Sequence, residues 1–156
     1  HRIGFVIAGG EAALLRAVEN AEDSAETACM HIADMGVAQN DVVIGLAASG
    51  STVFTTAALV AAGQAGAVTI GVANNPDTAL LESVSYPILL ATGAEIIAGS
   101  TRLQAGTAQK ICLNLISNMI MVKMGFGVDG MMANMVPTNA KLRRRRAEID
   151  ARLKPD

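Results

Sequence analysis

Three hydroxyl side chains and a glycine stand together in the segment Ser49-Gly50-Ser51-Thr52, where an apolar run ends and a helix is expected to begin. Backbone N–H groups and the positive end of the helix dipole meet at such a point, and together they favour a bound phosphate. Serine and threonine are also the commonest helix caps, so a purely structural role is equally compatible with this segment. The lysine of a nucleotide-binding P-loop and the glycine spacing of a dinucleotide-binding loop are both missing, which disfavours kinase and dehydrogenase functions.

Arg102 is a second candidate, because it falls in the first turn of a long expected helix that Ser100 or Thr101 could cap. A cation at that position opposes the helix dipole, so it calls for a compensating anion. A substrate phosphate or carboxylate would supply one, since a guanidinium binds either group through two parallel hydrogen bonds. The structural alternative is a salt bridge to Glu95, which local reasoning slightly favours.

Glu22 is the third candidate and lies in an acidic stretch between two expected helices. Acidic residues at such a junction are usually solvated caps, which is the better interpretation of the local sequence. The stretch could nonetheless direct a carboxylate to the mouth of the sheet. There a partly desolvated glutamate would have the raised pKa that acid–base catalysis needs.

The elements that would position these residues alternate between short apolar runs and longer alanine-rich stretches. Residues 41–46 and 67–73 are apolar on both faces, as is typical of strands that helices cover on both sides. The alternation predicts an α/β fold with a parallel sheet and helices on both faces, in which ligands bind outside the carboxyl ends of the strands. We expect strands near 2–7, 41–46, 67–73 and 84–90, and helices near 11–19, 23–35, 53–64, 78–82, 103–123 and 138–153.

The composition excludes several classes of protein. Of the 156 residues 51% are apolar, which excludes a disordered chain, and 12 Lys and Arg against 14 Asp and Glu leave no basic field to recruit nucleic acid. Residues 111–122 are too short and too polar to span a membrane, and no signal peptide is visible. Cys29 and Cys112 lack metal-ligand spacing, so we expect reduced cysteines, a cytoplasmic protein and no metal.

These features occur together, in the same order, in a known family. The sequence resembles the N-acetylmuramic acid 6-phosphate etherases, which are sugar-isomerase-type (SIS) proteins related to the glucokinase regulatory protein. The most specific matching stretches are Gly99-Ser100-Thr101-Arg102-Leu103 and Ala105-Gly106-Thr107-Ala108-Gln109-Lys110. Further matches lie at 7–11, 17–23, 41–50 and 138–142, so the resemblance covers nearly the whole chain.

The resemblance implies an SIS-type, flavodoxin-like three-layer sandwich formed by residues 1–156 as a single domain, with a C-terminal helical extension at about 138–156. It also implies cleavage of the D-lactyl ether of N-acetylmuramic acid 6-phosphate in cell-wall sugar recycling, giving N-acetylglucosamine 6-phosphate and D-lactate. Family chemistry is elimination followed by addition of water, without metal or organic cofactor. The alternatives are a non-catalytic sugar-phosphate-binding regulator and an aldose–ketose phosphate isomerase of the SIS class.

By position, the resemblance makes Glu22 one of two acid–base glutamates. Ser49, Gly50, Ser51 and Thr52 would form the sugar-phosphate site, Arg102 would contact the anionic substrate, and a homodimer is expected. The family's N-terminal part, with a Gly-Thr-Ser-Gly loop and the other glutamate, is absent, so we expect a sheet incomplete at the N-terminus and the C-terminal part of a longer family chain. Differences from the family leave the exact substrate open; they are Ser51, Ala98 and Gln104, where the family often has Arg, Thr and Lys.

Overall fold

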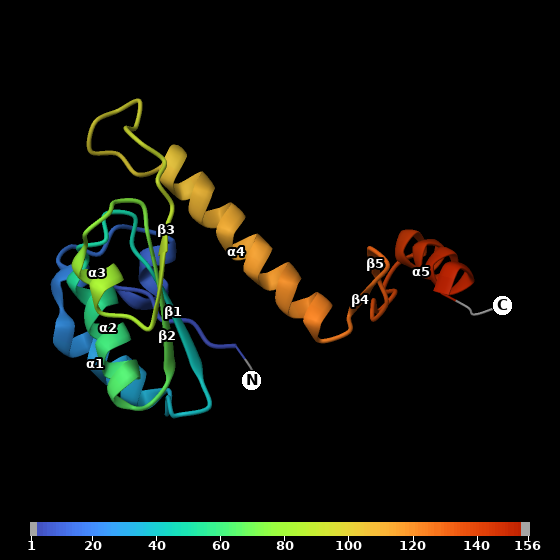
Figure 1. Ribbon diagram of the computed structural model, residues 1–156, viewed down its shortest axis with the longest axis horizontal. Coiled ribbons are helices and arrows are strands. Elements are labelled where there is room, and N and C mark those ends of the chain that lie inside the picture. The colour runs from blue at the N-terminus through green and yellow to red at the C-terminus, as the bar shows by residue number, and fades with distance from the viewer. Residues whose placement is uncertain (1–2, 154–156) are drawn as a thin grey trace. The chain divides into compact units, whose positions relative to one another are not determined.

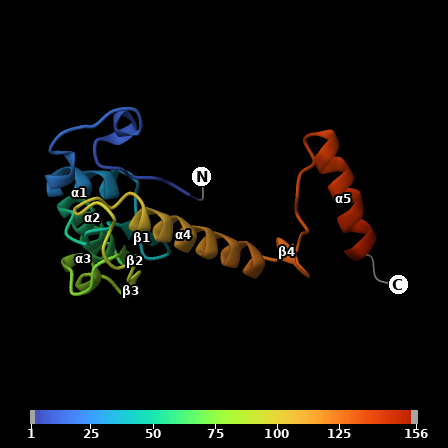
Figure 2. The same cartoon turned by 90° about the horizontal axis from the view of Figure 1, so that it is seen from above.

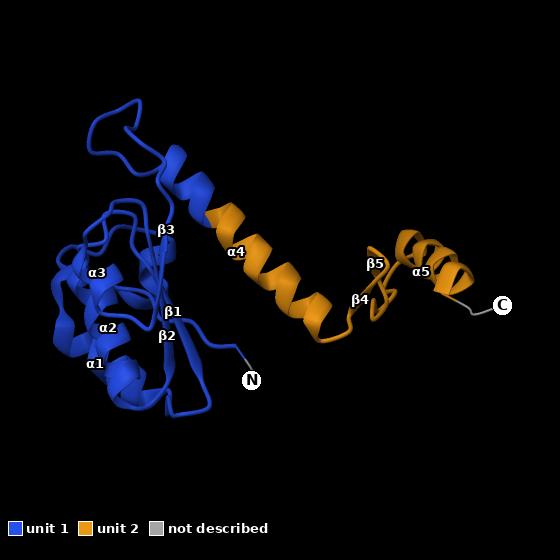
Figure 3. Cartoon of the chain, viewed as in Figure 1, with its two compact units in different colours: residues 1–109 blue, residues 110–156 orange. Residues whose placement is uncertain are grey.

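The computed structural model describes residues 3–153 (Figure 1). It divides into two compact units, residues 1–109 and 110–156, and the division falls inside the helix α4 (Gln104–Lys123) (Figure 3). A single domain over residues 1–156 stays a prediction. No helix of the described chain is long and apolar enough to cross a membrane.

The first unit contains a parallel sheet of three strands, which confirms the predicted α/β class. The strands are β1 (Val42–Leu46), β2 (Val68–Ala73) and β3 (Tyr86–Leu89), in the order β1-β2-β3. Val42 pairs with Val68, and Ile70 pairs with Tyr86. β3 forms an edge of this sheet, where Pro87 is tolerated although it cannot donate to the strand ladder.

Three helices of this unit, α1 (Ala25–Asp34), α2 (Val53–Gln64) and α3 (Ala79–Glu82), lie on one side of the strands in both views (Figures 1 and 2). Two glycines that are register partners make room for them. A Cβ atom on Gly45 would lie 2.5 Å from Leu59 of α2, and one on Gly71 would lie 2.7 Å from Leu80 of α3. These three helices therefore share one face of the sheet, and the predicted cover of the other face by helices stays a prediction.

The core of the unit consists of two clusters of buried side chains. One joins α1 to α2 and is made mostly of alanines, which allow the two helices to approach closely; its members are Ala28, Ile32, Phe54, Ala58, Ala62 and Ala67. The other packs α2 and α3 on the sheet and contains Ala47, Leu59, Ala73 and Leu80. On the opposite face of the sheet, Ile44, Ile70 and Ile88 are only half-buried.

The N-terminal segment differs from the prediction. Residues 3–8 form no strand, Arg2 of the predicted strand lies outside the described residues, and the segment continues with the short 3-10 helices η1 (Gly10–Leu14) and η2 (Ala21–Asp23). The predictions of a strand near 2–7 and a helix over 11–19 are therefore wrong. Phe5 is 90% exposed, because no strand of the described chain pairs with this segment, although Val6 and Ala8 pack against the cluster between α1 and α2.

The second unit contains the rest of α4, an antiparallel pair of strands β4 (Gly127–Val128) and β5 (Met131–Met132), and the helix α5 (Ala140–Leu153). Asn139 caps α5 by accepting a 2.9 Å hydrogen bond from the main-chain N–H of Leu142. The Arg146 guanidinium donates to the carbonyls of Ala133 and Met135 and forms an ion pair with Asp150. Arg146 thus ties α5 to the segment after the hairpin.

The contact between α3 and the sheet depends on Leu80, which is 0% exposed. The substitution Leu80→Ala is expected to lower the free energy of unfolding by about 2–5 kcal/mol, because it leaves a cavity in a packed core. Urea denaturation followed by circular dichroism measures this loss. Leu89→Ala, at a side chain that is 44% exposed, is the matched control and should lose clearly less. Equal losses would contradict the packing described for Leu80.

Candidate functional site

The turn between β1 and α2 leaves its hydroxyl groups free of helix capping. Thr52 is the N-cap residue of α2, yet its side chain makes no capping hydrogen bond. The Ser49 hydroxyl accepts hydrogen bonds from the main-chain N–H of Ser51 at 3.2 Å and from the Ser51 hydroxyl at 3.1 Å. The hydroxyls of Ser49, Ser51 and Thr52 therefore do not cap α2, and the start of this helix remains open to an anion.

The segment after β2 holds this turn (referred to below as the hydroxyl turn, residues 49–52). The Leu80 main-chain N–H donates to the Gly50 carbonyl at 3.1 Å, and the Asn75 side-chain amide donates to the Ser49 carbonyl at 3.3 Å. Gly50 has a φ of +74°, and a Cβ atom there would collide with the Thr78 side chain. Glycine at this position is thus required by both conformation and space.

Glu95, rather than Ser100 or Thr101, caps α4. Its two carboxylate oxygens accept hydrogen bonds from the main-chain N–H groups of Gln104 and Ala105, at 3.1 and 2.9 Å. The expected cap by Ser100 or Thr101 is therefore wrong, because a carboxylate satisfies two unpaired N–H groups at once and also interacts favourably with the helix dipole.

Arg102 is exposed in the turn just before α4. Its main-chain N–H donates to the Ser100 hydroxyl at 3.4 Å. The alternative of a salt bridge to Glu95 is not seen, and among residues 3–153 the Arg102 guanidinium has no ion-pair partner. The guanidinium therefore remains available to an anion from outside the described chain.

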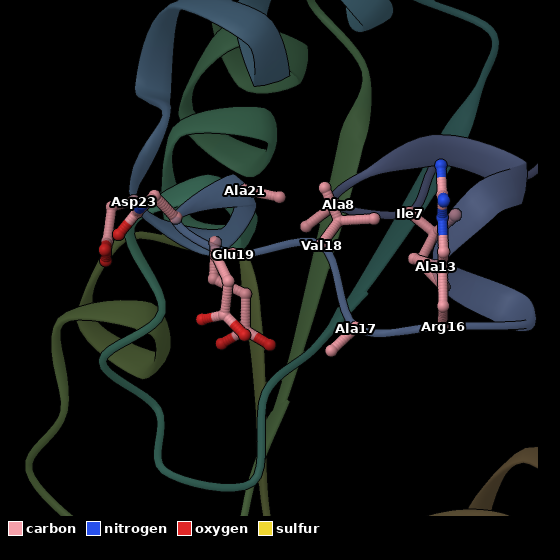
Figure 4. A pocket seen from close by; sticks show the side chains of 11 residues that line it. Ile7, Ala8, Ala13, Arg16, Ala17, Val18, Glu19, Ala21 and Asp23 are labelled. Atoms are coloured by element: carbon pink, nitrogen blue, oxygen red, sulfur yellow. The ribbon is translucent and has the colours of Figure 1, made fainter.

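Glu22 lines a cavity of about 540 Å³ in the N-terminal segment, together with other residues between Ile7 and Asp23. Figure 4 shows the Glu19 carboxylate and the Arg16 guanidinium on opposite sides of this cavity. The η2 helix that carries Glu22 contacts α2, the helix that follows the hydroxyl turn. Glu22 is exposed rather than partly desolvated as the catalytic interpretation expects.

The structure locates the hydroxyl turn, Arg102 and Glu22, but it does not bring the three together in one cavity. Ser49, Gly50, Ser51 and Thr52 form one continuous turn at the carboxyl end of β1, as predicted, whereas neither this turn nor Arg102 belongs to the lining of the Glu22 cavity. Their convergence on one sugar stays a prediction. Sequence reasoning missed two residues that support these sites, Asn75 at the hydroxyl turn and Glu95 at the start of α4. The turn-forming Asn-Asn-Pro sequence was a signal for Asn75. No group of three His, Cys, Asp or Glu residues suited to a metal occurs within residues 3–153.

A pair of glycine substitutions tests the packing of the hydroxyl turn. Gly50 and Gly99 both have positive φ, but only a side chain at Gly50 meets a neighbour. Gly50→Ala and Gly99→Ala should each cost about 1–2 kcal/mol for the left-handed backbone, and Gly50→Ala should cost more because it displaces Thr78. Unfolding in urea measures both, and equal losses would argue against the contact between Thr78 and the turn.

The cap on α4 is tested by Glu95→Ala, with Glu11→Ala as a control at an exposed glutamate. Removing the carboxylate should speed hydrogen exchange at the Gln104 and Ala105 amides by a factor of about five, as expected for a cap contributing about 1 kcal/mol. Exchange at other α4 amides reports how far the first turn frays. If exchange at Gln104 and Ala105 stays at its original rate, Glu95 does not cap the helix.

Comparisons with known proteins cover most of the chain. The family model described as the glucokinase regulatory protein N-terminal SIS domain matches residues 1–64. A Deinococcus radiodurans protein named N-acetylmuramic acid 6-phosphate etherase is 47% identical over 137 residues, which are 88% of this chain and 45% of that protein. An Escherichia coli protein of the same name is 42% identical over 144 residues, 92% of this chain and 48% of that protein.

Among solved structures, a protein of Salmonella typhimurium described as a candidate phosphosugar isomerase aligns with a TM-score of 0.41 and 28% identity. The alignment covers 52% of this chain and 25% of that chain, and it is too loose to carry an argument. The chain spans about half the length of the curated relatives that it matches. The resemblance found in the sequence is nevertheless confirmed, because 88–92% of the chain is similar to proteins named N-acetylmuramic acid 6-phosphate etherase.

Proposed function

We propose that this protein takes part in cleaving the D-lactyl ether of N-acetylmuramic acid 6-phosphate, with N-acetylglucosamine 6-phosphate and D-lactate as products. The observation that carries the proposal is the hydroxyl turn, which lies between the carboxyl end of β1 and the start of α2. The Thr52 side chain does not cap α2, and the hydroxyls of Ser49 and Ser51 bond to each other. The names of the relatives give the reaction, and the turn gives a place for the phosphate.

In this proposal the hydroxyl turn holds the sugar phosphate. Ser49 and Ser51 would donate hydroxyl hydrogen bonds, Gly50 allows a close approach of the backbone, and Thr52 stands at the start of α2, where the dipole favours negative charge. Arg102 would contact an anionic group of the substrate, because its guanidinium is exposed and has no ion-pair partner among the described residues.

The chemistry proposed for the family has two halves. In the elimination, a base removes the proton at C2 of the open-chain sugar while an acid protonates the lactyl oxygen as its bond to C3 breaks, which releases D-lactate. Water then adds across the resulting double bond. We assign one of these acid–base roles to Glu22, on its match to the family, and the second group would come from outside the described residues.

We also propose a cytoplasmic homodimer. Both cysteines are free, as is usual in a reducing compartment. Large apolar side chains on α4, Leu115, Met119 and Val122 among them, are exposed in this chain and are suited to burial against another protein surface.

A non-catalytic sugar-phosphate regulator is the second candidate function. It is favoured by the exposure of Glu22, which lacks the desolvation that an acid–base glutamate needs. An aldose–ketose phosphate isomerase would share the fold class, so fold alone does not separate it from the lyase, but it would release no lactate. Calorimetric titration with sugar phosphates beside a coupled D-lactate assay distinguishes the candidates, because binding without lactate release indicates the regulator.

The substitution Glu22→Gln tests the acid–base role. It is expected to abolish D-lactate release from N-acetylmuramic acid 6-phosphate, because the amide cannot exchange a proton with the substrate, while binding of N-acetylglucosamine 6-phosphate remains measurable. Glu26→Gln, at an exposed glutamate of α1, is the control and should keep the original rate. Unchanged turnover in Glu22→Gln would reject the assigned role.

A further inference from the structure

The hydroxyl turn is held through three successive carbonyls. The carbonyl of Ala48 accepts from the main-chain N–H of Asn74 at 3.0 Å, and that of Gly50 accepts from the main-chain N–H of Leu80 at 3.1 Å. Between them, the carbonyl of Ser49 accepts from the side-chain amide of Asn75 at 3.3 Å. Two of these three bonds are made by backbone groups, which any sequence supplies, and the middle one depends on the side chain of Asn75.

The Ser49 carbonyl matters because the hydroxyl of the same residue is part of the proposed sugar-phosphate site. The Ser49 hydroxyl receives two hydrogen bonds, from the main-chain N–H and the hydroxyl of Ser51, so the two serines form a bonded pair. The direction of the Ser49 side chain follows the orientation of its own peptide groups. A bond that fixes its carbonyl therefore also fixes where the paired hydroxyls point.

We propose that Asn75 is a positioning residue for the sugar-phosphate site: it acts through the Ser49 carbonyl and aims the Ser49–Ser51 hydroxyl pair, without touching the ligand itself. This inference rests on the proposed function of the hydroxyl turn. Asn75 is exposed, so its side chain contributes little to the core, and its amide supplies the N–H donor that this carbonyl accepts.

Substitution by alanine separates positioning from stability. Asn75→Ala removes the donor and adds no charge near a phosphate, so it is expected to weaken binding of N-acetylglucosamine 6-phosphate by about fivefold, as for the loss of one hydrogen bond. The midpoint of urea unfolding should stay unchanged. Asn40→Ala, at another exposed asparagine, is the matched control and should bind with the original affinity.

A double substitution shows whether Asn75 acts through Ser49. In a Ser49→Ala background the hydroxyl pair no longer exists, so adding Asn75→Ala should cost no further affinity. A direct contact between Asn75 and the ligand would instead keep its full penalty in that background. The inference is overturned if Asn75→Ala binds like the original protein, or if its penalty is undiminished beside Ser49→Ala.

A second measurement is independent of any ligand. The Gly50 amide nitrogen belongs to the same peptide group as the Ser49 carbonyl, so its ¹⁵N chemical shift should change in Asn75→Ala and stay unchanged in Asn40→Ala. If the unsubstituted chain binds neither N-acetylglucosamine 6-phosphate nor inorganic phosphate, the proposed function fails. The Gly50 shift then decides this inference alone: an altered shift supports the hold on Ser49, and an unaltered shift rejects it.

Discussion

The helices α2 and α3 reach the sheet because two paired positions in neighbouring strands, Gly45 and Gly71, carry no side chains. Gly45 and Gly71 face the helices, and a methyl group on either would collide with Leu59 or Leu80. Those two leucines are almost completely buried and anchor α2 and α3 on the same face. Since α2 begins directly after the hydroxyl turn, the location of that turn at the carboxyl edge of the sheet depends on the same two glycines.

The helices α2 and α4 begin in opposite ways, and the difference bears on where an anion can bind. At α4, the Glu95 carboxylate occupies the first main-chain N–H groups, so this helix start is already neutralised by the protein. At α2, the N-cap side chain of Thr52 makes no such bond, and the nearby serines bond to each other. Of the two helix starts, the one at α2 is therefore the one suited to a phosphate.

The elements predicted well from sequence are those that need no partner, or whose partners lie near them in the chain. The range 53–64 for α2 and the end of α1 before Gly36, which has a positive φ, follow from apolar content and glycine. The segment near Phe5 has strand-like composition, but a strand needs a neighbour to pair with, which composition does not reveal. The Glu95 cap was missed because it lies nine residues before the amide it binds. The position of the hydroxyl turn was predicted, whereas the environment of Glu22 depends on contacts that local patterns do not contain.

The strand order has a consequence for handling the chain in solution. β1 has β2 on one side, and on its other side no strand of the described residues pairs with Val42–Leu46. A row of main-chain donors and acceptors along such a border is a template on which another extended segment can add. The same chain has an exposed apolar stretch around Phe5. Strand addition at this border is thus a route to aggregation, and charged residues introduced at its outer positions are the remedy that natural sheets use.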